Sequence, residues 1–327
     1  MSPTPFIHRP LLFIIYQPEI DGLPPKGFDA KQHSPEMVVK RIAQDGAKCI
    51  KVYTEDGFDL ASDWPTISSE ILKRVRAAAT KHGLKMMAHA NAVDMQRMAV
   101  DADADILAHG MWNWLNLESE SGLPLEIKQL GDEILKKKMV YQPTLNVMRG
   151  LRDLTIADHL SHPDYKNVIS ADAFDWYRSD NGQWFSKVLT QGWGNRTLAQ
   201  IQQQLGKILN KGERVLQYLY KKGHPMVLAT DTPPAPTYAS QPGVSANWEI
   251  KHLYKLGVSL PHILAAATIN NAQSFNIDQD YGSIDIGKIA NLLLLDSNPL
   301  STITAYDEIN TVILHGVSHK RAIFKIR

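Results

Sequence analysis

The sequence of 327 residues contains a single cysteine, Cys49, which excludes a disulfide within the chain. Lysine and arginine (35) nearly balance aspartate and glutamate (34), so the formal net charge of +1 provides no strong field for nucleic acid or an anionic membrane. Long apolar runs are also missing, since no stretch approaches the roughly 20 apolar residues that span a bilayer. We therefore expect a globular chain held together by packing or by metal.

Two further absences narrow the function classes. The longest apolar run, Leu11–Tyr16, is too short for the core of a signal peptide and follows no basic segment, so we interpret it as a buried strand. A soluble, cytoplasmic protein is the resulting expectation. No Gly-x-Gly-x-x-Gly or Walker-type loop follows any expected strand, which disfavours a nucleotide-binding protein.

The most informative pattern present is a pair of short apolar runs that each end at a histidine. Met86–Ala88 precedes His89, Ile106–Ala108 precedes His109, and apolar residues recur at helical spacing over Ala92–Val100. This order of strand, helix and strand predicts a parallel βαβ unit. Residues just past the carboxyl ends of such strands face the ligand site. One histidine there is more often a core residue, but its recurrence indicates a metal or catalytic site.

The same alternation continues along the chain and predicts six βα units. Strands are expected near residues 11, 49, 86, 106, 139 and 226. Helices are expected after a Ser34 cap and over Pro65–His82, Ala92–Val100, Leu123–Lys137, Thr197–Tyr220, Ala246–Leu256 and Pro261–Phe275. A closed barrel needs eight units. The predicted fold class is therefore α/β, an incomplete TIM-like (β/α)8 barrel of about six units, with an open doubly wound sheet as the alternative.

Two regions depart from this alternation and suggest the domain organisation. Residues 150–195 form an insertion rich in aromatic side chains, which suits a lid over a site or a packed peripheral subdomain. Residues 282–327 contain short strand-like runs, at Leu292–Leu295, Thr311–Leu314 and Arg321–Ile326. We expect a barrel domain over residues 1–281 and a small C-terminal β segment over residues 282–327.

Four polar residues, Lys51, His89, His109 and Asp231, fall at or near the ends of expected strands. Histidine and aspartate are typical ligands of a catalytic zinc ion. Such an ion lowers the pKa of bound water to about 7 and polarises a carbonyl group, while a carboxylate can carry the proton to a leaving group. A lysine that burial keeps neutral can react with CO₂ to form an anionic carbamate ligand. For Lys51 alone, a surface lysine is the simpler interpretation.

Eight short segments carry a family resemblance through their order and spacing. They are Gly46–Tyr53, Ala88–Ala90, Asp105–Gly110, Tyr141–Thr144, Ala229–Asp231, Ala265–Phe275, Gly282–Leu292 and Asp296–Pro299. Together they resemble the metal-dependent amidohydrolase superfamily, in the branch of imidazolonepropionases and Xaa-Pro or related dipeptidases. The resemblance implies an enzyme that hydrolyses a C–N bond, in an amide, dipeptide or cyclic amide, by attack of metal-bound hydroxide.

The resemblance also implies roles for individual residues. Lys51 is the lysine that is often carboxylated and bridges two metals in this superfamily, and His89 and His109 bind the second metal. Asp231 binds the first metal and acts as the proton shuttle. Tyr141 lines the substrate pocket. The implied cofactor is a divalent metal, most readily zinc, as one or two ions.

One feature of the superfamily is missing from the sequence. A His-x-His pair ends the first barrel strand there, yet the twelve histidines of this chain include no such pair. The first two barrel strands and half of a β-sandwich are therefore expected to be absent. The alternative function is a catalytically inactive, truncated chain that serves as a metal-binding or interaction scaffold. Expected partners are a small-molecule or dipeptide-like substrate, with no nucleic acid or membrane; a homo-oligomer is compatible with the sequence.

Overall fold

The computed structural model describes residues 15, 17, 21–23, 26–57, 64–117, 119, 122–233 and 237–324. The expected strand Leu11–Tyr16 lies outside the described residues apart from Ile15, which belongs to no strand. The chain divides into two compact units, residues 1–118 with 125–141 and residues 119–124 with 142–327. The predicted boundary between residues 281 and 282 stays a prediction.

The first unit is built on a parallel sheet whose strands follow one another in chain order. Its described strands are β1 (Cys49–Tyr53), β2 (Lys85–His89), β3 (Ile106–Ala108) and β4 (Val140–Gln142), in the order β1-β2-β3-β4. In the parallel pairing of β1 with β2, Tyr53 lies opposite His89. In that of β2 with β3, His89 lies opposite Ala108. This arrangement confirms the strands predicted near residues 49, 86, 106 and 139.

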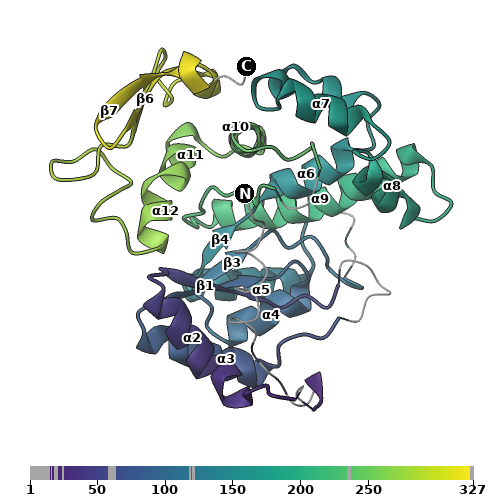
Figure 1. The fold of residues 1–327 in the computed structure, drawn as a ribbon, viewed down its shortest axis with the longest axis vertical. Helices are drawn as coiled ribbons and strands as arrows, with labels where there is room; N and C mark the ends of the chain where they lie inside the picture. Colours follow the sequence, from purple (N-terminus) through teal and green to yellow (C-terminus); the bar gives the residue numbers. More distant parts are fainter. Residues whose placement is uncertain are drawn as a thin grey trace. The chain divides into compact units, whose positions relative to one another are not determined.

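Helices cover one side of this sheet (Figure 1). They are α2 (Pro35–Gln44), α3 (Ser69–Lys81), α4 (Val93–Asp101) and α5 (Leu125–Lys136). Because successive side chains of a strand point to opposite faces, Met86 and Ala88 of β2 are fully buried, whereas Met87 and His89 are only half-buried. Lys51 of β1 and His89 of β2 therefore lie on the less buried face of the sheet.

Serine side chains decide where the first two helices begin. Ser34 accepts a hydrogen bond from the backbone N–H of Met37 (3.4 Å), which confirms the predicted cap. Ser68 does the same for Ile71 (3.3 Å), so α3 begins at Ser69 and not at Pro65 as predicted. The later start follows from the cap, because Pro65 lies in extended chain ahead of it.

The second unit is mainly helical in its described part. Its helices are α6 (Leu145–Asp153), α7 (Ala171–Arg178), α8 (Trp184–Gln191), α9 (Leu198–Lys221), α10 (Val244–Lys255), α11 (Leu260–Ala267) and α12 (Ile269–Ser274), with 3-10 turns at His159–Ser161 and Pro163–Asn167. Aromatic residues of the predicted insertion pack with Tyr238 and Trp248 in one core cluster of this unit. None of the described helices is long and apolar enough to cross a membrane.

The strand predicted at Pro225–Ala229 is wrong, because these described residues belong to no sheet. Side-chain amides take the place of a neighbouring strand. Asn270 donates to the carbonyl of Met226 (3.0 Å), and Asn271 donates to that of Leu228 (2.9 Å). Two carbonyl groups of the apolar segment are thus satisfied without strand pairing.

Two other predictions fail near the C-terminus. The helix expected over Pro261–Phe275 divides into α11 and α12 at Thr268, whose φ of −131° and ψ of −95° are not helical, and most of its residues are only half-buried. The strand expected at Arg321–Ile326 is a 3-10 turn over Arg321–Phe324, the part of it that the structure describes. The apolar pattern of the sequence indicates neither the helix break at Thr268 nor the turn at Arg321–Phe324, because short apolar runs do not distinguish helix, strand and turn.

The predicted C-terminal β segment is confirmed as an antiparallel sheet within the second unit. Its described strands are β5 (Leu292–Leu295), β6 (Ile309–Leu314) and β7 (Val317–Lys320), in the order β5-β6-β7. β6 and β7 are joined by His315 and Gly316, whose φ angles are both positive (+48° and +81°). Two residues of this conformation form the tight turn that suits the twist of a hairpin.

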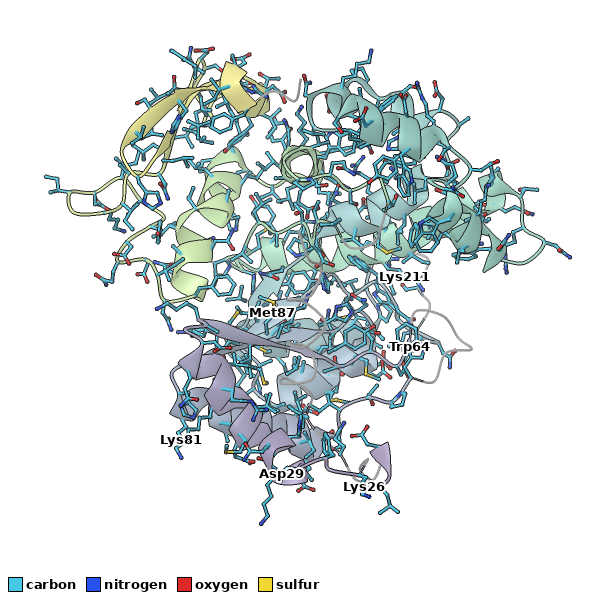
Figure 2. All side chains as sticks on the ribbon, in the orientation of Figure 1. Lys26, Asp29, Trp64, Lys81, Met87 and Lys211 are labelled. Carbon is cyan, nitrogen blue, oxygen red and sulfur yellow. The ribbon has the colours of Figure 1, made fainter. Side chains whose placement is uncertain are left out.

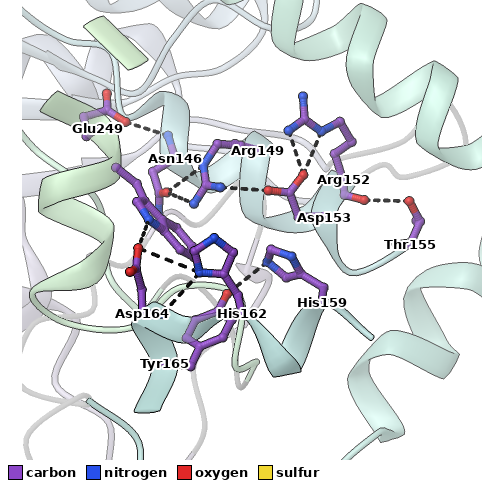
Figure 3. Close-up of polar contacts among 11 residues, drawn as sticks. Asn146, Arg149, Arg152, Asp153, Thr155, His159, His162, Asp164, Tyr165 and Glu249 are labelled. Carbon is purple, nitrogen blue, oxygen red and sulfur yellow. Dashed lines mark hydrogen bonds and ion pairs between the residues drawn. The ribbon is translucent and has the colours of Figure 1, made fainter. Parts of the chain in front are cut away.

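A buried carboxylate holds the start of α6. Glu249 of α10 is fully buried and accepts hydrogen bonds from the N–H groups of Leu145 (2.9 Å) and Asn146 (2.6 Å). Figure 3 shows the contact with Asn146. These N–H groups have no partner within the helix, and the helix dipole favours an anion beside them. Burial nevertheless raises the pKa of Glu249 to about 7, against the two hydrogen bonds, which lower it.

The rest of α6 is fixed by a buried ionic network. Arg149 donates to the side-chain oxygen of Asn146 (2.7 and 3.1 Å) and to Asp153 (2.8 Å), and its guanidinium lies 3.9 Å from the centre of the Trp248 ring (Figure 3). Asp153 is 3% exposed and also accepts from Arg152 (2.7 Å). A buried charge is tolerated when it is paired in this way.

The pH dependence of stability tests the role assigned to Glu249. Because its pKa of about 7 in the folded chain lies above the ordinary 4.5, the folded state binds more protons between those values, and the free energy of unfolding falls as pH rises through them. Urea unfolding at about pH 5 and about pH 8 should show that the natural chain loses about 3 kcal/mol more than Glu249→Gln, which has no such titration. Parallel losses in both proteins would contradict this assignment.

Candidate functional site

Three of the four predicted site residues lie in the first unit. Lys51 is exposed on β1, His89 is the last residue of β2, and His109 follows β3 directly. Figure 2 marks Met87, the residue of β2 that pairs with Lys51. The parallel register thus places His89 and His109 at the carboxyl ends of β2 and β3, whereas Lys51 lies two residues before the level of His89, which pairs with Tyr53.

The two histidine rings are in contact. The ring centres of His89 and His109 lie 4.5 Å apart, at an interplanar angle of 67°. Tyr53 stacks on His89, with 4.4 Å between the ring centres and an angle of 24°. Trp112 lies further along, 6.1 Å from the centre of His109. The predicted proximity of the two imidazoles is therefore present in the structure.

His109 is held in its neutral form by its surroundings. It is 2% exposed, and burial lowers its pKa to about 3, with a further lowering from the positive charge of Lys51. A neutral imidazole keeps a lone pair, which is the form that binds a divalent cation.

The backbone at His109 makes a sharp corner. Its φ of +81° is in the left-handed region, where residues other than glycine are uncommon. The next residue, Gly110, passes so close to the Trp112 indole that an added Cβ would lie 2.3 Å from its Nε1. Only glycine fits there, so the corner that carries His109 depends on this close approach.

Local hydrogen bonds fix the end of β2. The N–H and the hydroxyl of Thr54 both donate to the carbonyl of His89 (3.2 and 2.5 Å). Beyond the strand, the side-chain amide of Asn91 lies 3.2 Å from Nε2 of His89. The side chain of Gln96 donates to the carbonyls of Ala90 (3.0 Å) and His109 (3.4 Å), which joins the two strand ends.

Glu55 is a buried carboxylate beside the end of β2 that the sequence pattern did not indicate. It is 2% exposed, and its Oε1 accepts hydrogen bonds from the N–H groups of Asn91 and of Ala92, the latter at 3.0 Å. Burial raises its pKa to about 7, against these two bonds, which lower it. The available signal was Ala92, since an alanine cannot cap the helix that follows, and the missing acceptor must come from elsewhere in the chain.

The other two predicted site residues, Asp231 and Tyr141, belong to different units of the chain. Asp231 belongs to the second unit, is half-buried and has a φ of +48°, so it also sits at a left-handed corner. Tyr141 is 1% exposed, and its hydroxyl accepts a hydrogen bond from the N–H of Met111 (3.0 Å). Burial raises the pKa of Tyr141. The proton transfer assigned to Asp231 and the substrate contact assigned to Tyr141 stay predictions.

The donor set fits a divalent ion only if Lys51 contributes. Within the described ranges, no group of three or more histidine, cysteine, aspartate or glutamate side chains is arranged to hold a metal. His89 and His109 supply two adjacent imidazoles, and a carbamate on Lys51 would add an anionic oxygen. Two nitrogens and an oxygen form a typical set for zinc.

Comparisons with solved structures show a shared fold at low sequence identity. A Xaa-Pro dipeptidase with bound methionine is 18% identical, with a TM-score of 0.61, and the match covers 92% of this chain and 64% of that one. A prolidase complexed with N-methylphosphonate-L-proline is 16% identical, with a TM-score of 0.57, and the match covers 88% of this chain and 58% of that one. An ochratoxinase from A. niger is 19% identical, with a TM-score of 0.58, and the match covers 90% of this chain and 55% of that one. The chain thus spans less than two thirds of the length of each.

Sequence comparison gives the family. A search of curated protein sequences finds no match. The sequence model described as "Amidohydrolase family" matches residues 7–318, which is most of the chain. This confirms the resemblance that the strand-end motifs indicated. The chain belongs to the amidohydrolase family.

Proposed function

We propose that this chain hydrolyses a C–N bond in an amide, dipeptide or cyclic amide with the help of a divalent metal ion. The observation that carries the proposal is the pair of touching imidazoles, His89 and His109, at the ends of adjacent parallel strands. Family membership supports it, since amidohydrolases generally use a divalent metal. The solved structures named a dipeptidase and a prolidase support a small, dipeptide-like substrate.

His89, His109 and a carboxylated Lys51 would hold the ion in this proposal, which we take to be zinc, as one or two ions. When bound, a divalent ion supplies a Lewis acid that polarises the substrate carbonyl and lowers the pKa of a bound water. The low pKa of His109 keeps its ring neutral at physiological pH, so no proton competes for its lone pair. The Tyr53 ring, stacked on His89, limits rotation of that imidazole.

Asp231 moves the proton in this proposal. Its carboxylate accepts a proton from the attacking water and returns it to the departing nitrogen, so that the amine leaves neutral. Tyr141 contributes to the substrate pocket. We further propose that the parallel sheet is part of an incomplete barrel, and that the protein works in the cytoplasm on a small-molecule or dipeptide-like substrate.

A second candidate function is a metal-binding scaffold without hydrolysis. One observation favours it: the twelve histidines of the sequence include no His-x-His pair. Metal binding without turnover separates it from the first proposal.

Removing the histidines tests the metal site. His89→Ala and His109→Ala should each weaken zinc binding by at least tenfold, because each removes one nitrogen ligand. The measurement is zinc retained after dialysis against graded chelator. His82→Ala, at the exposed end of α3 in the same unit, is the matched control and should retain zinc like the natural chain. Equal retention in all four proteins would reject the site.

Bicarbonate should reveal the role of Lys51. If the amine forms a carbamate ligand, added bicarbonate should tighten zinc binding of the natural chain and add the mass of one CO₂ in native mass spectra. Lys51→Arg keeps the positive charge but has no amine that forms a carbamate, so neither effect should appear. A bicarbonate response that persists in Lys51→Arg would show that another group is responsible.

Replacing the proton shuttle should separate catalysis from binding. On a panel of Xaa-Pro dipeptides and N-acyl amino acids, kcat of Asp231→Asn should fall by about 10²- to 10⁴-fold, the usual contribution of a positioned general acid or base. Its fold, followed by circular dichroism, should be unchanged. Failure of the zinc-loaded natural chain to hydrolyse any member would favour the scaffold, and full activity of Asp231→Asn would remove Asp231 from the mechanism.

A further inference from the structure

We propose that Asn91 is a positioning residue that sets which nitrogen of His89 faces a bound cation. The inference rests on the proposed function, in which His89 is a ligand. Its basis is a contact between Nδ2 of the Asn91 side-chain amide and Nε2 of the His89 ring, at 3.2 Å. Groups that hold the second nitrogen of a ligating histidine fix its ring orientation and tautomer. Because Asn91 takes Nε2, a cation on this ring binds Nδ1.

Asn91 is well placed to act in this way because its backbone is fixed on both sides. Its N–H donates to the buried carboxylate of Glu55, and its carbonyl accepts from the N–H groups of Trp112 (3.0 Å) and Asn113 (3.2 Å). Asn91 is itself 7% exposed. These hydrogen bonds hold the Asn91 backbone in place. Rotation of the terminal amide therefore decides whether oxygen or nitrogen faces His89.

The orientation of that amide decides the tautomer. Oδ1 of Asn91 is buried and has no hydrogen-bond partner in the part of the chain that the structure describes. A half-turn of the amide exchanges Oδ1 and Nδ2, so that Oδ1 accepts the Nε2–H of His89. The ring then carries its proton on Nε2 and its lone pair on Nδ1, ready for a cation. The orientation in the structure, with Nδ2 against Nε2, instead donates to Nε2 and leaves the proton on Nδ1, which blocks binding there; the half-turned amide is therefore the metal-binding form.

Glu55 acts on His89 through Asn91. One oxygen, Oε1, accepts from both Asn91 and Ala92, so the carboxylate fixes the turn between β2 and α4. Burying a carboxylate is costly, and the carboxylate of Glu55 is 2% exposed. The cost is explained if the turn must hold Asn91 against the ring. Since a single oxygen receives both bonds, the carbonyl of Glu55→Gln can replace it.

The tautomer of His89 tests the proposal directly, by NMR of chain labelled with ¹⁵N-histidine. His89→Ala identifies its signals. In the natural chain, metal-free His89 should show one fixed tautomer, and zinc should leave the proton on Nε2. In Asn91→Leu, which has similar volume but no polar group, the metal-free ring should average between tautomers. An averaged ring in the natural chain, or an unchanged fixed ring in Asn91→Leu, would overturn the proposal.

Zinc affinity gives the second readout. Asn91→Leu should bind zinc about 10- to 100-fold more weakly, and Glu55→Gln should stay within about threefold of the natural chain. If Asn91→Leu does not fold, Asn91→Asp replaces it: its carboxylate can only accept, so the ring should keep Nε2–H and zinc should bind as tightly as before. A tenfold loss in Asn91→Asp would refute the role. Absence of zinc binding in the natural chain would refute the proposed function, while the metal-free tautomers still test Asn91.

Discussion

The turn that leads from β2 into α4 depends on two hydrogen bonds accepted by one carboxylate oxygen of Glu55. In this parallel sheet a helix follows the strand, and the first N–H groups of a helix have no partner within the helix. Ala92 at the start of α4 cannot supply one. Glu55, from the end of the neighbouring strand, does so, and thereby fixes the residues that follow His89.

The second unit uses the same solution at α6, where Glu249 accepts from Leu145 and Asn146. In both places a buried carboxylate comes from a distant part of the sequence, and in both burial raises its pKa to about 7. Burying such a group in its ionised form destabilises the fold, but the hydrogen bonds that it accepts stabilise the backbone of the turn. His109 shows the opposite response to the same burial, since a low pKa keeps it uncharged. Burial therefore raises the pKa of the two carboxylates that cap the helices and lowers the pKa of the imidazole of His109.

The sequence predicted those features that depend on interactions between residues close together in the chain. The alternation of apolar runs located β1, β2 and β3, and the histidines that follow two of them are the ones in contact. The cap at Ser34 was also predictable, because its hydrogen bond reaches only three residues along the chain. In the C-terminal sheet, short apolar runs located β5 and most of β6, whereas β7 lies a few residues before the strand that was predicted.

Prediction failed where the deciding partner is distant in sequence. The segment Pro225–Ala229 has a strand-like composition, but its carbonyls are satisfied by amides of Asn270 and Asn271, more than 40 positions away. Glu55 was missed for the same reason, since its partners, Asn91 and Ala92, lie 36 and 37 positions further on. No periodicity in the sequence encodes such pairs.

The central claim is that the imidazoles of the first unit bind a divalent ion. X-ray absorption spectroscopy of the zinc-loaded chain tests it most directly, because the fine structure identifies the atoms bound to zinc. The account predicts first-shell scattering from nitrogen and oxygen alone at about 2.0–2.1 Å, with the outer-shell pattern of two imidazole rings. A spectrum with sulfur in the shell, or without imidazole scattering, would contradict it.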